Sequence, residues 1–443
     1  MSSATTRRAF LGASVGLAGW ALADEPGRFP YAQGGPPAER AGARPKIAAV
    51  TTVYHYLSHA YHIVGRFLDG FVVHDGRGFH RPPFEIASLF IEQTPANDLG
   101  RTKANRHGVR LAPSIADALT LGTGQLAVDG VLLIAEHGDY PYNEKLQKLY
   151  PRGRFFREVL EVFRGSGRGV PVFLDKHLSY DRAEARRMVE EAKALGVPLM
   201  AGSSLPVTWR LPPVEVPLGK TWREAVVASR GEIEIFGFHA LETLQCMIER
   251  RDRKGRPQGV VAVTCLEGDD VWKAGDAGRW SWELLDRALS RSHTLNPGDV
   301  RQNTRDFVPP PGRPTFLATP IAFLVEYADG LRAAALILNG HVDDTTFAGR
   351  LEGGSVVSTL FYLPAPPGAK FFDPLVLRIE DFFRSRKPPY PVERTLLTGG
   401  ILDAALESRL QKGRRVETPD LAAIDYEAPA DSGFIRSPIA EDG

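Results

Sequence analysis

The chain has 443 residues, which is long enough for two domains and a large core. Apolar residues make up 43% and charged residues 24% of the sequence, as in ordinary soluble globular proteins. A formal net charge of +1 argues against a broad basic surface, so we expect no nucleic-acid partner.

The N-terminus has the layout of a twin-arginine export signal. In "TTRRAFLGASVGLAGWALADE", Arg7 and Arg8 precede a small-residue apolar stretch that ends in an A-x-A sequence. The stretch is shorter than the roughly 20 residues that span a bilayer. We therefore predict a signal at residues 1–23 and a periplasmic or otherwise extracytoplasmic protein; an uncleaved anchor or a disordered tail is the alternative. Residues 24–45 are predicted as a linker, and no later stretch is long and uncharged enough for a membrane span.

Strand and helix patterns alternate over residues 46–210. Strands are expected at Ile47–Val53, Glu85–Glu92 and Val131–Ala135, and in "GVPVFLDKHLSYD" and "VPLMAGSSLPVTWR". Helices are expected at Ser114–Leu121, with Ser114 as N-cap, and at Phe155–Phe163 and Asp181–Leu195. This alternation predicts an α/β domain with a Rossmann-like, doubly wound parallel sheet.

The pattern of expected helices and strands changes after Arg210. One helix is expected in "EIEIFGFHALETLQCMIER", and "GVVAVTCLEG", "IAFLVEYADGLRAAALILNG" and "VVSTLFYLP" are typical of antiparallel strands. We predict an α+β domain with a mostly antiparallel sheet at residues 211–417 and a tail at 418–443 that drapes or frays. Cys246 and Cys265, the only cysteines, lie in apolar segments and are expected to be buried free thiols.

Ligands of open α/β sheets bind at the carboxyl ends of the strands. That rule selects five polar loops in the first domain, which are Tyr54–His62, Glu92–Asn97, Glu136–Tyr142, Asp175–Tyr180 and Gly202–Arg210.

Three stretches together resemble the Gfo/Idh/MocA oxidoreductase family. "VDGVLLIAEHGDY" is similar to the family's D-A-V-x-I-A-T-P-x-x-x-H strand and loop, and "GVPVFLDKHLSYDRAEARRMVEEAKALGVPLMAG" to its G-K-x-V-x-x-E-K-P segment. "GGILDAALESRLQKGRRVE" resembles the closing helix. The resemblance implies a Rossmann domain followed by a second α/β domain. It also implies NAD or NADP as cofactor, a sugar or related polyol as substrate, and pairing through the open face of the second sheet.

The resemblance places Lys176 at the lysine of E-K-P, near the nicotinamide and the substrate hydroxyl. A lysine there can donate a hydrogen bond to a developing alkoxide or accept a proton. Asp175 stands for the Glu and His177 for the Pro of that motif. The family's second signature, G-G-x-x-x-D-x-x-x-H, falls where Glu242 replaces the Asp and Cys246 the His. His239 lies nearby, so Lys176, Glu242 and His239 are the catalytic candidates.

The expected dinucleotide turn departs from the glycine-rich pattern. Residues 51–57 contain no glycine, and bulky Tyr54, His55 and Tyr56 should obstruct close approach of a pyrophosphate. Glu92 ends the second long strand and offers an acceptor for a ribose hydroxyl; a solvated surface residue is the alternative. We therefore predict unusual or impaired NAD(P) binding, with Thr52, Tyr54, His55, Glu92 and His137 around the cofactor position.

The spacing of His55, His59 and His62 is i, i+4, i+7, which predicts one helix face. Imidazoles so placed can hold a divalent metal, whereas a polar-aromatic patch that fills a vacant cofactor cleft is the alternative.

Side chains after the last parallel strands form a candidate substrate site. Serine hydroxyls can bind sugar hydroxyls, a tryptophan can stack on a sugar ring, and an arginine can bind a carboxylate. The predicted substrate-binding residues are His177, Ser203, Ser204, Trp209 and Arg210. "NGHVDDTTF" in the second domain either reaches this side of the sheet or forms an exposed turn.

We predict an exported oxidoreductase that acts on a sugar or sugar-derived small molecule and that forms a homo-oligomer. A non-redox lyase, hydratase or epimerase that uses Lys176 and a histidine, with or without a metal, is the alternative. A non-catalytic carbohydrate-binding protein is the third reading.

Overall fold

The computed structural model describes residues 44–73 and 78–436. The predicted export signal and most of the predicted linker lie outside the described residues. The first half of the chain forms a six-stranded sheet in which all pairs are parallel. Its order is β5 (Arg110–Leu111), β4 (Glu85–Ile91), β1 (Lys46–Thr51), β6 (Gly130–Ile134), β7 (Val172–Asp175) and β8 (Leu199–Gly202). The predicted Rossmann-like, doubly wound fold is confirmed.

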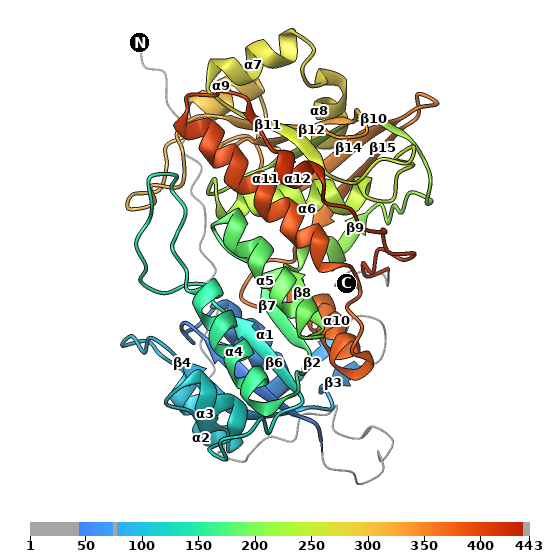
Figure 1. Ribbon diagram of the computed structural model, residues 1–443. Helices are drawn as coiled ribbons and strands as arrows, with labels where there is room; N and C mark the ends of the chain where they lie inside the picture. The colour runs from blue at the N-terminus through green and yellow to red at the C-terminus, as the bar shows by residue number, and fades with distance from the viewer. Residues whose placement is uncertain (1–43, 74–77, 437–443) are drawn as a thin grey trace, which may run out of the picture. The chain divides into compact units, whose positions relative to one another are not determined.

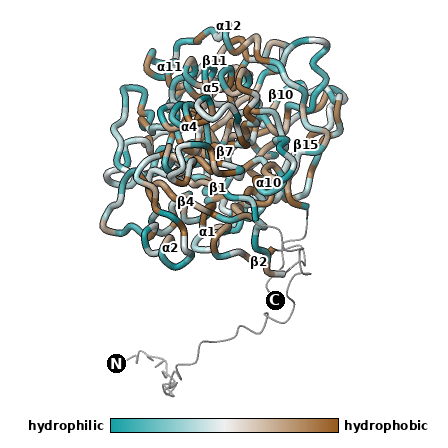
Figure 2. The backbone as a smooth tube through the Cα atoms, turned by 60° about the horizontal axis from the view of Figure 1, so that its bottom comes forward, coloured by the Kyte–Doolittle hydropathy of each residue, from teal (hydrophilic) through white to brown (hydrophobic). Residues whose placement is uncertain are grey.

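Both faces of this sheet are buried, and residues along each strand alternate between two cores. In β1, Ile47 and Ala49 pack with one hydrophobic cluster, and Ala48 and Val50 pack with the other. Such two-sided burial explains why the parallel strands are almost continuously apolar in sequence. Figure 2 shows hydrophobic segments concentrated in the interior around β1 and β7.

Helices cover the two faces of the first sheet. Helices α3 (Ile115–Thr120), α4 (Arg152–Ser166) and α5 (Arg182–Ala194) lie on one face, and α1 (His59–Asp69) lies on the other. The short helix α2 (Gly100–His107) packs near β4 and β5, and a hairpin of β2 (Phe71–Val73) and β3 (Gly78–His80) follows α1. The Ser114 side chain accepts a hydrogen bond from the backbone N–H of Asp117, so the predicted N-cap of α3 is confirmed.

The second half forms an eight-stranded sheet that is mostly antiparallel, as predicted. Its order is β16 (Val416–Glu417), β11 (Val260–Glu267), β12 (Ile321–Tyr327), β13 (Arg332–Ile337), β10 (Trp222–Ser229), β14 (Thr345–Leu351), β15 (Val356–Tyr362) and β9 (Trp209–Leu211). The pair β10–β13 is the parallel exception. β9 belongs to this sheet through β15, although its first two residues fall inside the predicted first domain.

Helices also pack on both faces of the second sheet. Helices α6 (Ile235–Ile248) and α11 (Val392–Leu410) lie on the face toward the first sheet (Figure 1), and α7 (Asp269–Asp276) and α8 (Trp282–Leu289) lie on the opposite face, near the short helix α9 (Val300–Arg305). The family resemblance suggests pairing through an open sheet face. Here Trp272, Trp280 and Leu284 of that helical layer cover part of this face. The oligomer therefore stays a prediction.

One helix from late in the chain returns to the first sheet. Helix α10 (Phe372–Ser385) follows β15 but packs beside α1 (Figure 1), and Phe382 and Phe383 join Ile47 and Leu132 in the same core. The short turn η1 (Leu205–Val207) and helix α12 (Pro419–Ala422) complete the described elements.

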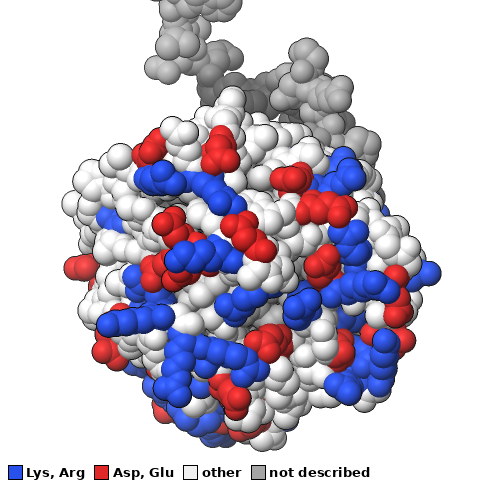
Figure 3. All heavy atoms as spheres, turned by 90° about the horizontal axis from the view of Figure 1, so that it is seen from above, with Lys and Arg blue, Asp and Glu red and all other residues white. Residues whose placement is uncertain are grey.

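The described part of the chain after residue 417 packs on the second half. Tyr426 is buried and contacts Gln245 and Glu249. Cys246 and Cys265 are buried free thiols, as expected. Among the described residues, no helix combines the length and the hydrophobicity that a bilayer span requires. Basic and acidic side chains are interspersed over the face drawn in Figure 3.

Candidate functional site

A cavity of about 730 Å³ lies where the carboxyl ends of β6 and β7 meet the second half of the chain. His55, His59, Glu136, His137, Lys176 and Ser204 line it from the first half. Arg230, Glu232, Phe236, His239, Asp343 and Asp344 line it from the second. Cavities at this end of a parallel sheet are the usual ligand sites of the fold.

Lys176 lies in the wall of this cavity, directly after β7. Its Nζ atom is 3.5 Å from Oε1 of Glu136, and its backbone N–H donates to the Gly202 carbonyl at 3.1 Å. Arg152 forms a second, short ion pair with Glu136. Burial alone would raise the pKa of Glu136, but the charges of Lys176 and Arg152 hold it well below its ordinary value. The predicted catalytic lysine is therefore buried beside the carboxylate of Glu136.

Backbone strain occurs in the loops that follow β6 and β7. His137 after β6 has φ 69°, and Lys176 after β7 has φ 66°. Non-glycine residues rarely adopt this left-handed region, and such strain often occurs at functional sites. Burial lowers the pKa of His137 to about 3, with a further effect from His59, and its Nε2 atom has no hydrogen-bond partner. His137 is therefore a neutral, under-satisfied imidazole at the cavity.

The imidazole of His59 forms a short contact with the carboxylate of Asp175, the residue that precedes Lys176. Its Nδ1 atom lies 2.6 Å from Oδ2 of Asp175, which is completely buried. Ser58 caps α1 by accepting from the N–H of Tyr61, so His59 is the first residue of the helix. The His59 ring also packs edge-on against Phe372 of α10.

Ser203 links Glu242 and His239 through its hydrogen bonds. The carboxylate of Glu242 accepts from the backbone N–H of Ser203 at 2.9 Å and from its hydroxyl, which lies 3.1 Å from Nδ1 of His239. Burial raises the pKa of Glu242 to about 7. Burial and the charge of Lys176 hold the pKa of His239 well below its ordinary value. His239 lines the cavity, whereas Glu242 stands behind it and orients the Ser203–His239 pair.

The opposite wall carries paired charges and aromatic rings. Arg230 lies 3.1 Å from Asp343, and Arg313 lies 2.7 Å from Glu232. Phe371 and Phe372 contribute rings from the start of α10 and the residue before it. A wall with donors, acceptors and flat apolar surfaces suits a small hydroxylated molecule.

The turn between β1 and α1 is held by contacts of Thr52 and Tyr54. Tyr54 points into the core with no exposed surface, and its hydroxyl has no hydrogen-bond partner. Its carbonyl accepts from the N–H of Leu99 at 2.7 Å, and Thr52 donates to the carbonyl of Glu136 at 2.9 Å. Neither Thr52 nor Tyr54 lines the cavity. Thr52 and Tyr54 therefore contact other parts of the first half rather than the cavity.

Contacts also bridge the position expected for the adenosine ribose. The carboxylate of Glu92 accepts short bonds from Tyr140 and Arg154. The side chain of Gln93 exchanges two hydrogen bonds, of 2.9 and 3.1 Å, with the backbone of Asp139. These bonds join the end of β4 to the loop after β6.

The predicted metal site is corrected by the placement of the three histidines. His55 lies in the turn before α1, so it does not share the helix face. His62 stacks on Phe372, and burial lowers its pKa to about 3. Among the residues that the structure describes, no group of three His, Cys, Asp or Glu side chains is arranged to hold a metal ion. The cavity instead brings His55 and His59 within 5.7 and 5.2 Å of His137, measured between ring centroids.

Several predicted substrate residues lie behind the cavity rather than in its wall. Ser204 lines it, but His177, Ser203, Trp209 and Arg210 do not. Arg210 is buried between the rings of Phe361 and Phe434. Because Trp209 begins β9, it packs into the second sheet instead of a sugar site. Their prediction as direct ligand contacts is corrected on these grounds.

Sequence patterns gave little sign of the second-half wall. Asp343 and Asp344 carried a weak signal as polar residues after a strand, and both line the cavity. Arg230, Glu232 and Arg313 come from loops without a recognisable motif. Glu136 lies in a predicted ligand loop but was not singled out.

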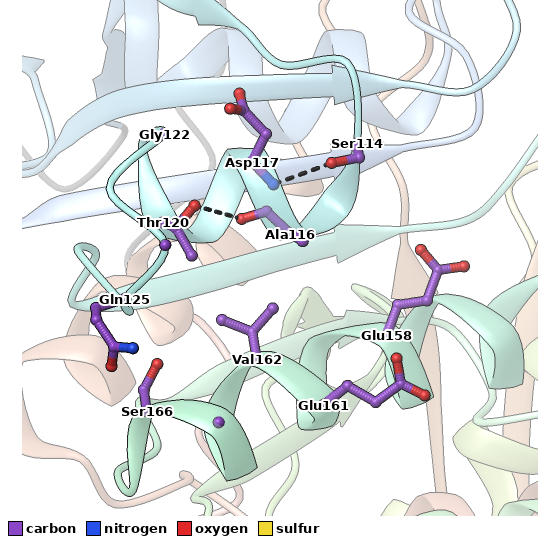
Figure 4. Close-up of a pocket in the computed structure, with 12 residues that line it drawn as sticks. Ser114, Ala116, Asp117, Thr120, Gly122, Gln125, Glu158, Glu161, Val162 and Ser166 are labelled. Carbon is purple, nitrogen blue, oxygen red and sulfur yellow. Dashed lines mark hydrogen bonds between the residues drawn. The ribbon is translucent and has the colours of Figure 1, made fainter.

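A second hollow, of about 620 Å³, lies between α3 and α4 on the outside of the first sheet (Figure 4). Ser114 and Asp117 line it from α3, and Glu158 and Glu161 from α4. Its lining residues include no histidine, lysine or cysteine, and Asp117 and Glu158 pair with arginines. The cavity at Lys176, in contrast, is lined by histidine, lysine, arginine and carboxylate side chains.

Known proteins were compared with this chain by sequence and by fold. No family model and no curated protein matches the sequence. The structure is similar to that of GenD2 from gentamicin A biosynthesis, solved in complex with NAD, with a TM-score of 0.52 and 16% identity over 86% of this chain and 99% of that chain. It is also similar to a "probable dehydrogenase" from Thermotoga maritima, with a TM-score of 0.50 and 13% identity over 85% and 99% of the two chains. The chain thus shares the overall fold of these two proteins.

Proposed function

We propose that the protein is an enzyme that transfers protons to and from a sugar or sugar-derived substrate in the cavity at Lys176. The observation that carries this proposal is the buried Lys176 ammonium beside Glu136, in a wall shared with His137 and His239. A cation held there can donate to a developing alkoxide or enolate in a partly dry site. The contact with Glu136 holds the Lys176 side chain in place.

A sugar-derived substrate is supported by the cavity wall. Tyr142, Glu232 and Asp343 offer hydrogen-bonding groups, and Phe236 and Phe372 offer ring faces. Hydroxylated ligands need donors and acceptors on several sides, and their C–H faces pack on aromatic rings. The resemblance to the Gfo/Idh/MocA family favours the same substrate class.

Two versions of this function differ in their use of a dinucleotide. The fold shared with GenD2, which binds NAD, favours an NAD(P)-dependent oxidoreductase. The buried Tyr54 and the bonds of Glu92 and Gln93 favour non-redox chemistry, such as that of a lyase, hydratase or epimerase. We prefer the non-redox version, because a dinucleotide would require a position unlike the standard one.

Calorimetric titration with NAD+, NADH, NADP+ and NADPH separates the two versions. The non-redox version predicts no binding of any of the four at millimolar concentration. Binding with a micromolar Kd would favour the oxidoreductase instead and would call for a structure of that complex.

Turnover of a sugar panel tests whether the protein is an enzyme or a binder. Aldoses, ketoses and sugar acids would be incubated with the full chain, with and without NAD(P), and products followed by NMR. Lys176→Ala should abolish turnover while circular dichroism stays unchanged. The matched control is Lys193→Ala, because Lys193 is exposed and pairs with Glu393 outside the cavity. A carbohydrate-binding protein would instead bind panel members without converting any.

We also propose export through the twin-arginine route and assembly into a homo-oligomer. Replacing Arg7 and Arg8 by lysine should retain the chain in the cytoplasm, which cell fractionation would detect. Light scattering of the purified protein would give its oligomeric state.

A further inference from the structure

We propose that His59, held by Asp175, is the second proton-transfer group of the cavity, and that the cavity enolises carbonyl sugars. In this reaction the imidazole removes a proton from the carbon next to a carbonyl while Lys176 stabilises the oxygen. The inference rests on the proposed proton-transfer function and names the chemistry of the same site.

The position of His59 is fixed from three sides. It begins α1, whose N-cap is Ser58, and its ring lies against Phe372. Its Nδ1 atom is 2.6 Å from Oδ2 of Asp175. Asp175 is the last residue of β7 and immediately precedes Lys176, so one strand end presents the carboxylate and the lysine together.

The contact with Asp175 selects the tautomer of the imidazole. An ionised carboxylate only accepts hydrogen bonds, so Nδ1 carries the proton that it receives. The remaining nitrogen, Nε2, then has a free lone pair on a side chain that lines the cavity. A buried carboxylate that orients an imidazole in this way is the arrangement that general bases require.

The proposed step balances without any oxidant or reductant. Nε2 of His59 takes the proton from the carbon next to the carbonyl, and the C–H electron pair forms a C=C bond. The carbonyl π pair moves to the oxygen, whose charge is met by the Lys176 ammonium. Return of a proton from the imidazolium to the same carbon regenerates the sugar. Where that carbon bears a hydroxyl group, delivery of the proton to the former carbonyl carbon isomerises the sugar, because the hydroxyl proton passes to the former carbonyl oxygen and the hydroxyl carbon becomes the new carbonyl.

Two other short histidine–carboxylate pairs of the described chain lie away from the cavity. His80 lies 2.6 Å from Glu380, and His107 lies 2.9 Å from Asp69. Neither histidine lines the cavity. His80 is thus a matched control with the same pair distance and no access to the site.

Exchange of substrate hydrogen with solvent tests this inference directly. The full chain would be incubated in D2O, without dinucleotide, with D-fructose, 2-keto-D-gluconate and D-glucose as probes. NMR should show deuterium at the carbon next to the carbonyl of at least one probe. His59→Asn and Lys176→Ala should each lower the exchange rate by about 10²–10⁴-fold, the range for loss of a general acid or base. His80→Asn should leave it unchanged.

The outcomes distinguish the inference from the proposed function. Loss of exchange in Lys176→Ala with exchange retained in His59→Asn would refute the role of His59 and leave the proposed function standing. Absence of exchange in the wild type with all three probes would refute enolisation, and the turnover panel would still judge the proposed function.

Chemical modification gives a readout that needs no substrate. Diethyl pyrocarbonate should carbethoxylate His59 at Nε2, located by peptide mass spectrometry, because the contact with Asp175 occupies Nδ1 and the side chain lines the cavity. An unmodified His59 in a sample whose His55 reacts would show that the nitrogen is inaccessible and would overturn the proposal.

Discussion

The ammonium of Lys176 and the carboxylate of Glu136 form a buried ion pair, with 3.5 Å between Nζ and Oε1 and 3% exposure of each side chain. Glu136 also pairs with the buried guanidinium of Arg152, so one carboxylate compensates two cations. The two residues come from the ends of neighbouring parallel strands. Parallel pairing of β6 with β7 is therefore what brings acid and base together.

Glu136→Gln should destabilise the protein strongly. The substitution leaves Lys176 and Arg152 buried without their counter-charge, and breaking such a pair costs about 3–5 kcal/mol. Urea unfolding at pH 7 would measure the loss. Glu158→Gln is the control, because its exposed pair with Arg154 is expected to contribute less than about 1 kcal/mol. Equal effects of the two substitutions would contradict the buried pair.

Glu242 should make folding stability fall as pH rises from about 4.5 to 7. Burial raises the pKa of Glu242 from 4.5 to about 7, so the folded chain binds more protons here than the unfolded chain in that interval. Glu242→Gln removes this group. The stability of the wild type relative to the variant should therefore fall by about 1 kcal/mol per pH unit. Unfolding curves at pH 5, 6 and 7 check this, and a constant difference would disprove the raised pKa.

Tyr54→Phe should be neutral or stabilising. The hydroxyl of Tyr54 is buried and has no partner, so its removal relieves a desolvation cost of about 1 kcal/mol. Tyr426→Phe is the matched control, because it loses contacts with Gln245 and Glu249 and should be destabilising by about 1–2 kcal/mol. Thermal unfolding of both variants measures the contrast. A destabilised Tyr54→Phe would mean that the hydroxyl has a partner.

Ser58→Ala should cost more than Ser114→Ala. Both serines cap a helix, but Ser58 also accepts from the backbone N–H of His55 and is completely buried. We expect losses of about 2 kcal/mol for Ser58 and about 1 kcal/mol for Ser114. Chemical unfolding gives both values. Similar losses would show that the bond to His55 adds no stability.

The strands and helices of the first sheet could be predicted well, because each is indicated by its own local sequence pattern. The apolar run at Val131–Ala135 and the periodic helix at Asp181–Leu195 each identify an element by composition and spacing alone. Lys176 could be found because the segment around it resembles the E-K-P motif of the Gfo/Idh/MocA family. The ion pair of Lys176 with Glu136 could not, since it depends on which strands become neighbours.

Long-range packing accounts for what the sequence did not disclose. Trp209 and Arg210 follow a parallel strand in sequence, yet β9 crosses to the second sheet and removes them from the cavity. The i, i+4, i+7 spacing of three histidines suggested one helix face, but Ser58 starts the helix after His55. The position of the N-cap residue, rather than the spacing of the histidines, therefore determines where the helix begins.

Helix α10 carries an implication for dissecting the protein. It follows the last long strand of the second sheet, yet it covers apolar residues of the first, including Ile47 and Leu132. A truncated chain of residues 46–210 would lack α10, so the apolar residues of the first sheet that α10 covers would be exposed to solvent. The two halves are therefore not autonomous modules, and a recombinant fragment of the first would be expected to aggregate rather than fold.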